Sequence, residues 1–226
     1  MNNLAAAYWA SGQVAKAVPL LEETLEKMKA KLGPDHPHTL QTKKNLDLTR
    51  ALLTAEGRYR AKLAELGPKH IDTLLARRDM AQMYMSTNRL DDAEPVLLEV
   101  LHRMKDRAAG DEIVVFTTRL LRLCLTQRQQ ATPNAWQTFN TQSQLGGALL
   151  GQKKYAEAEP LLVKGYEGMK TREKTIPQQG SGELRIPEAL DRLIELYTAL
   201  NKPDEAKKWQ AERAKYPEAK KPETKK

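Results

Sequence analysis

Asp91-Asp92-Ala93-Glu94-Pro95-Val96-Leu97-Leu98 is the stretch that decides the fold, because the chain contains two further copies of it. These copies are Ala17-Val18-Pro19-Leu20-Leu21 and Ala156-Glu157-Ala158-Glu159-Pro160-Leu161-Leu162. In each copy a proline follows an alanine by two places, and apolar residues come directly after the proline. Nine residues before the alanine stand Tyr8, Tyr84 and Leu149, and Tyr197 precedes Ala206 by the same nine. A fixed offset that recurs in this way predicts a repeat array.

The composition favours helices throughout. Leu, Ala, Glu, Lys and Arg dominate the 226 residues, aromatic residues make up only 5%, and residues 113–116 are the one strand-like patch. We therefore predict an all-α fold. The single cysteine, Cys124, lies in an apolar helical run and is expected to be a buried, inert thiol in a reducing, cytoplasmic compartment. No apolar run is long enough to span a bilayer, and no signal peptide is recognised, so no membrane association is expected.

The repeats are of unequal length. Tyr8 to Tyr84 spans one unit of 42 residues and a second of 34, so we expect a helix at residues 39–56 and only about two turns of a second helix at 58–66. Ala93 to Ala158 spans one full unit and 23 further residues, so about one helix is missing near residues 111–130. The prediction is a superhelical array of antiparallel helix pairs, with one shortened and one half-deleted repeat.

The charge is concentrated at one end of the chain. Of the net charge of +8, residues 213–226 supply +4 through six Lys or Arg and two Glu. We interpret residues 1–212 as the helical repeat domain and residues 213–226 as a basic, disordered tail. Nucleic-acid binding by this tail is the less favoured reading, because no aromatic residue after Tyr216 is available for base stacking. If the tail does bind nucleic acid, the affinity should depend steeply on salt concentration, and this dependence should disappear when the tail is deleted.

The paired helices resemble tetratricopeptide repeats, in which a small residue, a Tyr three positions on and an Ala nine beyond that form the signature. The period and the turn Leu32-Gly33-Pro34-Asp35-His36-Pro37-His38-Thr39-Leu40 are similar to the kinesin-light-chain type. Asn2-Asn3-Leu4-Ala5 and, more weakly, Lys44-Asn45-Leu46-Asp47 look like that type's first-helix signature. The resemblance covers residues 1–212 and implies a protein-binding scaffold.

A narrower resemblance covers three later segments. Residues 136–143, 145–155 and 165–170 look like the closing repeats of large bacterial proteins, in which such arrays often follow a serine/threonine protein kinase domain. The resemblance implies a bacterial, non-catalytic C-terminal array of a larger signalling protein. No kinase glycine-rich loop, His-Arg-Asp or Asp-Phe-Gly motif is present in this sequence.

The residues that suggest a metal site or a catalytic site are better explained by structural roles. Asp35, His36 and His38 suggest metal ligands, but Pro37 separates the histidines and His70 recurs in the same turn, so a repeated helix cap is the preferred reading. Ser143 has no partner His and Asp within motif reach, and no phosphate-binding glycine loop occurs. We therefore predict no enzyme activity, no metal, no cofactor and no small-molecule substrate.

The predicted functional surface is a concave groove lined by the first helices of the pairs. Amides there would bond the backbone of an extended peptide and basic groups would hold an acidic side chain. The predicted groove residues are Asn2, Asn3, Trp9, Lys44, Asn45, Arg78, Gln82, Ser143 and Gln144. The expected function is binding of a peptide or partner protein. The alternative is a structural spacer that dimerises through the face left open near residues 111–130, so the chain is expected to be a monomer or a weak dimer.

Overall fold

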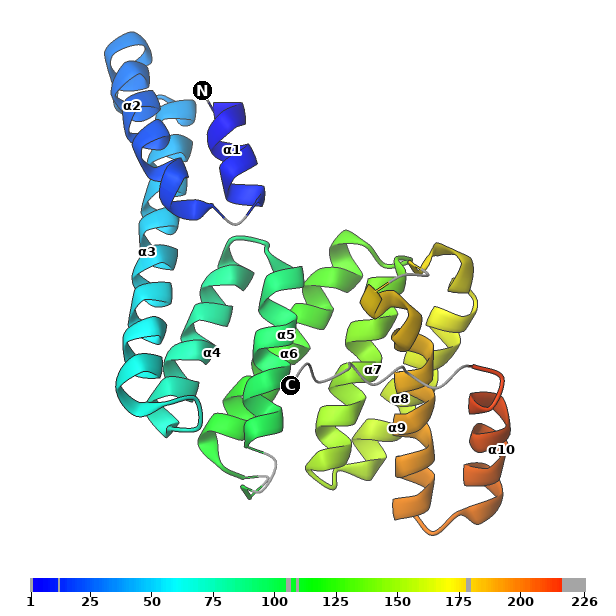
Figure 1. Ribbon diagram of the computed structural model, residues 1–226. Helices are drawn as coiled ribbons and strands as arrows, with labels where there is room; N and C mark the ends of the chain where they lie inside the picture. Colours follow the sequence, from blue (N-terminus) through cyan, green and yellow to red (C-terminus); the bar gives the residue numbers. More distant parts are fainter. Residues whose placement is uncertain (1, 12, 105–106, 109, 178–179, 217–226) are drawn as a thin grey trace, which may run out of the picture. The chain divides into compact units, whose positions relative to one another are not determined.

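The computed structural model describes residues 2–11, 13–104, 107–108, 110–177 and 180–216 (Figure 1). It comprises two compact units, unit 1 (Met1–Val96) and unit 2 (Leu97–Lys226), and the boundary between them falls inside one helix. Over the described residues the secondary structure is helical and contains no strand, so the predicted all-α fold is confirmed.

Ten α-helices follow one another along the described parts of the chain. Those of unit 1 are α1 (Asn2–Ala10), α2 (Val14–Leu32), α3 (Pro37–Leu66), α4 (Ile71–Ser86) and the first half of α5 (Leu90–Arg103). Those of unit 2 are the second half of α5, α6 (Glu112–Ala131), α7 (Trp136–Gly151), α8 (Tyr155–Lys170), α9 (Arg185–Ala199) and α10 (Pro203–Arg213). Two short 3-10 turns, Glu173–Thr175 and Gly180–Leu184, connect α8 to α9.

One backbone turn recurs between the helices of four pairs. The N–H of Gln13, Arg89, Lys154 or Lys202 donates to the carbonyl oxygen of Tyr8, Tyr84, Leu149 or Tyr197, respectively, at 2.8–3.0 Å. These acceptors are the residues whose nine-residue offset defines the repeat, and the hydrogen bond closes the end of the first helix in a Schellman-type turn. Four residues after each donor comes the repeat alanine, and all four alanines are buried. The periodicity of the sequence thus reflects one local structure.

A second turn recurs at the start of α3 and of α4. Gly33 and Gly67 end the preceding helices with φ of 91° and 78°, a region that favours glycine. Three residues later, Nδ1 of His36 or His70 accepts a hydrogen bond at 3.2 Å from the backbone N–H two positions on. The histidines are therefore N-caps, as the cap reading of this turn predicted.

α3 differs from the sequence prediction. Residues 39–56 and 58–66 were expected to form two helices, but they belong to one continuous helix of 30 residues. Gly57 does not take a left-handed φ, and Arg58 is not a residue type that caps a helix, so no turn forms between them. α2 packs on α3, and so does α4. The shortened repeat therefore contributes a single long helix in place of a pair.

One hydrophobic cluster of unit 1 lies between α1, α2 and the first half of α3. Its buried members are Ala5, Ala17, Leu21, Leu25 and Leu46. Trp9 packs against this cluster, and its indole Nε1 donates to Thr49 Oγ1 of α3 at 3.0 Å. The Arg89 guanidinium lies 5.5 Å from the Trp9 ring and 4.7 Å from the Tyr84 ring, which ties the α4–α5 turn to α1.

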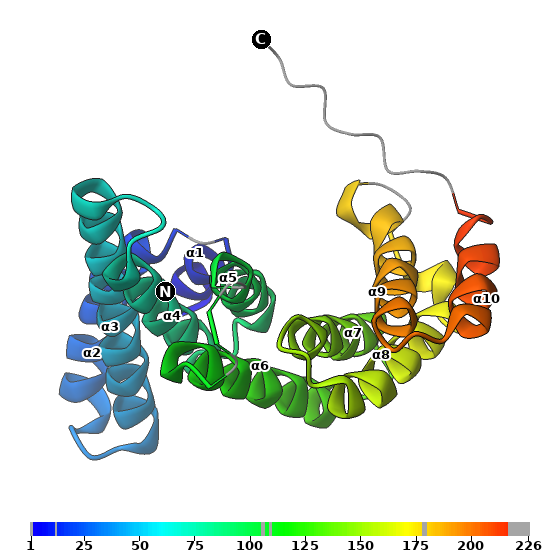
Figure 2. The same cartoon turned by 90° about the horizontal axis from the view of Figure 1, so that it is seen from below.

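In unit 2 the helices form two layers (Figure 2). One layer, which we call the inner side, consists of the second half of α5 together with α7 and α9. The other layer, the outer side, consists of α6, α8 and α10. α6, the helix expected to have lost its partner, packs against α7 and occupies a place in the outer layer. Its buried side chains include Leu121 and Cys124, so the expectation of a buried thiol is confirmed.

Glycines allow α7 and α8 to approach each other closely. A Cβ at Gly165 would lie 2.6 Å from the backbone nitrogen of Ser143, and a Cβ at Gly146 would lie 2.7 Å from Cγ of Leu162. Contacts of this length do not occur for real Cβ atoms, so neither position accepts a larger residue without separating the helices. This close contact fixes the orientation of α7, which carries most of the site described below.

The chain remains attached to unit 2 beyond residue 212. Nε of Arg213 donates to Asp191 of α9 at 2.8 Å, and Lys170 of α8 donates to the hydroxyl of Tyr216 at 2.5 Å. Residues 217–226, the greater part of the predicted basic tail, lie outside the described residues. Among the described helices, none combines the length and apolarity that a membrane span requires.

Candidate functional site

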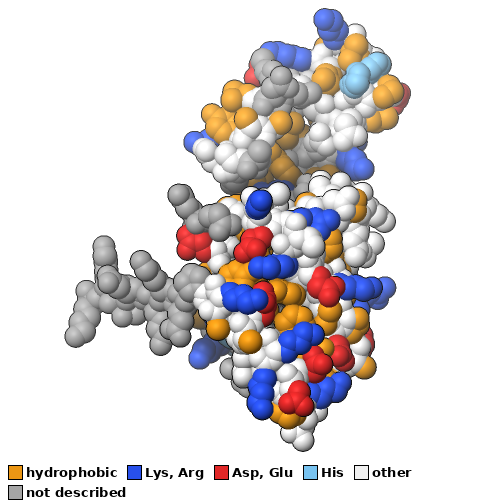
Figure 3. Space-filling model, turned by 90° about the vertical axis from the view of Figure 1, so that its right-hand side faces the viewer, with side chains coloured by type: hydrophobic (Ala, Val, Ile, Leu, Met, Phe, Trp, Pro, Cys, Tyr) orange, Lys and Arg blue, Asp and Glu red, His pale blue; other side chains and the backbone are white. Residues whose placement is uncertain are grey.

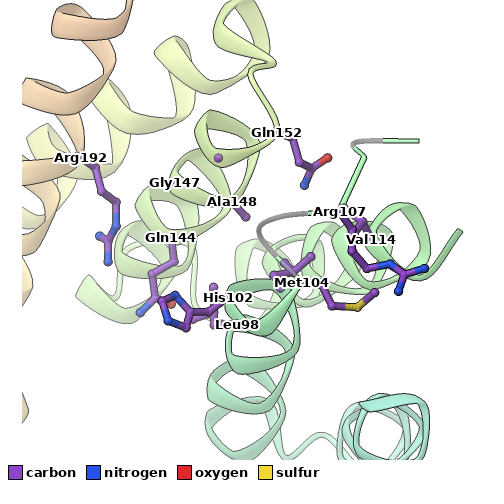
Figure 4. Close-up of a pocket in the computed structure, with 12 residues that line it drawn as sticks. Leu98, His102, Met104, Arg107, Val114, Gln144, Gly147, Ala148, Gln152 and Arg192 are labelled. Carbon is purple, nitrogen blue, oxygen red and sulfur yellow. The ribbon is translucent and has the colours of Figure 1, made fainter. Parts of the chain in front are cut away.

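A cavity of about 280 Å³ opens on the inner side of unit 2 (Figure 4). The second half of α5 and the segment after it form one wall, α7 forms the floor, and α9 contributes one arginine from the other side. The lining residues are Leu98, Leu101, His102, Met104, Arg107, Val114, Gln144, Gly147, Ala148, Gly151, Gln152 and Arg192. Sites for drug-sized ligands start at roughly 300 Å³, so this cavity has the volume of a few side chains and no more.

The floor of the cavity is built from helix geometry. Gln144, Gly147, Ala148 and Gly151 recur at spacings of three and four and therefore share one face of α7. A Cβ at Gly147 would lie 2.8 Å from Cδ of Arg192, so glycine at this position lets the arginine lie across the helix. Figure 4 shows Arg192 at one end of the cavity and Arg107 at the other.

The charge at the α9 end is positive. Arg185 and Arg192 both approach one carboxylate, that of Glu188, at 3.2 Å and 3.6 Å, so one positive charge is left over. Nη1 of Arg192 also donates to Ser143 Oγ at 3.2 Å. Burial, the largest influence, lowers the pKa of Arg192 from its usual range, and Glu188 partly opposes this shift. An arriving anion would relieve the cost of keeping this guanidinium charged.

Two amide oxygens in the cavity lack a donor. Oε1 of Gln144 and Oε1 of Gln152 are buried and accept no hydrogen bond from any residue that the structure describes. The other end of the Gln152 amide is fixed, because Nε2 donates to Thr118 Oγ1 at 2.8 Å. A buried acceptor without a donor costs about 1–3 kcal/mol, and a ligand that supplies N–H groups would remove that cost. The cavity thus presents a cation for an anionic group, and two of its lining residues, Gln144 and Gln152, have a buried oxygen without a donor among the described residues.

Of the predicted groove residues, Ser143 and Gln144 lie in unit 2 beside this cavity. Gln144 is 8% exposed and lines it. Ser143 is fully buried against α8, so its hydroxyl orients Arg192 and does not itself form part of an open surface.

The other seven predicted groove residues belong to unit 1. Lys44 and Gln82 are exposed, and Asn45 Oδ1 accepts from Gln41 Nε2 at 2.9 Å. Arg78 pairs with its neighbour Asp79 at 2.7 Å, which neutralises much of the charge expected to hold an acidic side chain. Trp9 is engaged by Thr49 and Arg89 as described above. The side chains of the remaining two, Asn2 and Asn3, lie outside the described residues.

Arg192, Gln152 and His102 line the cavity but are not among the predicted groove residues. Arg192 follows Ser143 by 49 residues, so no local spacing connects them. The one local signal in the sequence is the pair Gly146-Gly147, because two adjacent glycines inside a helix leave room for close contacts. Gly146 is packed against the Leu162 side chain of α8, whereas the open side of Gly147 accommodates the Arg192 side chain of α9. Among the described residues, no cluster of three or more His, Cys, Asp and Glu side chains is arranged to hold a metal ion.

Comparison with known proteins agrees with the repeat geometry. Residues 1–38 match the family model of the tetratricopeptide repeat. The chain carries a tetratricopeptide repeat. The matched segment covers α1, α2 and the turn into α3, and the α1–α2 turn shares its hydrogen bond with three later turns, so the predicted tetratricopeptide resemblance is confirmed.

Two solved structures show a general likeness. They are the nearly identical TPR-like repeats of a kinesin-light-chain-type protein from Podosopora anserina and a point variant of the same repeats. Each is 18% identical to this chain, covers 94% of it and matches over 91% of its own length, with TM-scores of 0.31 and 0.30. TM-scores this low support no conclusion about the arrangement of this chain. No curated protein matches the sequence.

Proposed function

We propose that this chain is a non-catalytic protein-binding module, and that the cavity of unit 2 accepts an acidic segment of a partner protein. Tetratricopeptide repeats generally mediate protein–protein interaction, which supports the general class. The observation that carries the specific proposal is that one cavity is lined by Arg192 and by two glutamines whose buried side-chain oxygens have no donor among the described residues. A peptide with a carboxylate side chain satisfies both when the glutamine side chains turn toward it, because its backbone N–H groups then donate to the amide oxygens while the carboxylate accepts from the guanidinium.

The walls add a preference for an apolar neighbour beside the acidic residue. Leu98, Leu101, Met104 and Val114 line the α5–α6 side of the cavity. Burying an aliphatic side chain there contributes about 1.5–3 kcal/mol. The exposed Lys44 and Gln82 of unit 1, together with Asn45 and Arg78, are proposed to form a further contact surface for the same partner. Two inferences from the sequence stay predictions: that the chain is part of a larger protein with a kinase domain, and that it is cytoplasmic.

The proposal is tested by binding of synthetic peptides. Fluorescein-labelled dodecapeptides containing a Glu or Asp next to a Leu are compared with the same peptides carrying Gln or Asn, with fluorescence anisotropy as the readout. Loss of a charge-assisted hydrogen bond costs about 1.5–3 kcal/mol, so Arg192→Gln should weaken acidic peptides by about 10–100-fold. Gly147→Ala should weaken them too, since its Cβ displaces Arg192 without removing the charge.

The matched control is Arg122→Gln. It removes the same charge from unit 2, but Arg122 pairs with Glu157 on the outer side and does not line the cavity. The proposal is wrong if the two arginine variants bind acidic peptides equally, or if Gln-containing peptides bind the parent chain as well as acidic ones.

A further inference from the structure

The outward face of α6 differs in chemistry from those of the other outer helices. Val115, Phe116 and Leu123 are 46%, 36% and 48% exposed and recur at spacings that place them on one stripe of the helix. The exposed positions of α8 and α10 are mostly charged: Glu157, Lys164, Glu167, Asp204, Glu205, Lys207 and Lys208. In Figure 3 the side of unit 2 nearest the C-terminal helices shows positive and negative side chains interspersed. A stripe of large apolar residues on α6 alone indicates an interaction surface.

The stripe carries one unpaired charge of each sign. Glu112 precedes Val115 by three residues, and Arg119 follows Phe116 by three. Neither Glu112 nor Arg119 forms an ion pair with any residue that the structure describes, although Arg122 on the same helix pairs with Glu157 at 2.5 Å. From Glu112 to Arg119 the exposed order along the stripe is therefore negative, apolar, apolar, positive, and the apolar Leu123 follows.

This order is self-complementary. When two copies of the helix run antiparallel, a residue near one end of the stripe faces a residue near the other end. Placing Val115 opposite Phe116 of the partner subunit brings Glu112 opposite Arg119 of the partner subunit. A two-fold axis then makes each contact twice, so two apolar contacts lie between two ion pairs.

We propose that unit 2 binds a second copy of this chain through the outward face of α6, in an antiparallel helix pair. A membrane surface fits the face less well, because amphipathic helices that bind membranes carry Lys and Arg around the apolar stripe, whereas Glu112 lies at one end of this one. A stable interface buries about 1,200–2,000 Å² in total, and a single helix pair provides less than that. The dimer is therefore weak and forms with rising concentration. The surface lies on α6 and is independent of the peptide-binding proposal.

Sedimentation equilibrium of the full chain tests the proposal, over protein concentrations from about 1 µM to about 500 µM. The parent chain should pass from monomer to dimer within this range. Glu112→Lys and Arg119→Glu each turn two attractions into repulsions and should raise the dissociation constant by about tenfold or more at low salt. The double variant exchanges the two signs and should return the dissociation constant to within about threefold of the parent value.

Lys164→Glu is the matched control, since it reverses an exposed charge on the outward face of α8 and should leave the dissociation constant unchanged. Phe116→Glu should remove the dimer, and its circular dichroism at 222 nm shows whether α6 still folds. A chain that stays monomeric over the whole range overturns the proposal. A dimer that responds equally to Lys164→Glu, or one that the double charge reversal fails to restore, overturns it as well.

Discussion

Gly165→Ala should destabilise unit 2, even though alanine is the better helix former. Replacing a glycine by alanine inside a helix normally gains about 1 kcal/mol. At this position the new Cβ would lie 2.6 Å from the backbone nitrogen and 2.8 Å from Cα of Ser143. Backbone atoms cannot rotate away, so α7 and α8 must separate, and such overpacking costs about 1–3 kcal/mol. We expect a net loss of up to about 2 kcal/mol.

Gly57→Ala is the control for this experiment, because it makes the same chemical change where no atom lies within 4 Å of the new Cβ. It should raise the stability of unit 1 by about 1 kcal/mol. Urea unfolding followed by circular dichroism and tryptophan fluorescence separates the two effects, since Trp136 and Trp209 lie in unit 2 and Trp9 in unit 1. A Gly165→Ala chain with an unfolding midpoint at or above that of the parent would refute the close-packing argument.

Three further predictions follow from single side chains. Burial first, and then a neighbouring glutamate, raises the pKa of Tyr84 and of Tyr197 to about 12, so absorbance at 295 nm should show both phenols ionising later than free tyrosine. Because the unfolded chain loses these protons near pH 10, stability should fall as the pH rises from about 10 to 12, and a flat stability over that range would contradict this. Asp111→Ala should destabilise α6 through loss of its N-cap, whereas Asp111→Asn should retain the cap; equal urea midpoints for the two variants would exclude this role. Lys153 has φ of 60°, so Lys153→Gly should gain about 1 kcal/mol in thermal unfolding, and Asn88→Gly should gain less because asparagine tolerates that conformation.

The helix pairs could be predicted because their signal is local. The nine-residue offset from Tyr84 to Ala93 and its equivalents records one turn, in which the backbone path and the buried alanine are both fixed within about ten residues. The same is true of the histidine caps. Patterns of this kind need no knowledge of distant contacts, so the sequence alone sufficed.

The continuous α3 could not be predicted on the same basis. Gly57 is compatible with a helix interior and with a helix end, and the choice depends on contacts made elsewhere. The Tyr84 hydroxyl donates to Glu56 at 3.0 Å, and Arg77 donates to the hydroxyl of Tyr59. Both contacts come from α4 and hold the two sides of Gly57 in one helix. Repeat counting assumed a turn at this point because the neighbouring units have one.

The candidate site was predicted only in part for a similar reason. Gln144 was identified from its place on a first helix, and it does line the cavity. Arg192 comes from another repeat, and its importance depends on sharing Glu188 with Arg185 and on lying over Gly147. These are relations between helices that a reading of one repeat at a time does not reveal.

The turn shared by the four helix pairs also has a practical consequence for engineering. Because the same backbone hydrogen bond joins Tyr8 to Gln13, Tyr84 to Arg89, Leu149 to Lys154 and Tyr197 to Lys202, each of these joints is a point where the polypeptide can be cut and rejoined in register. Chimaeras assembled at these joints would exchange whole hairpins between positions while leaving the local geometry intact. The chain is therefore a source of interchangeable parts for building new binding arrays.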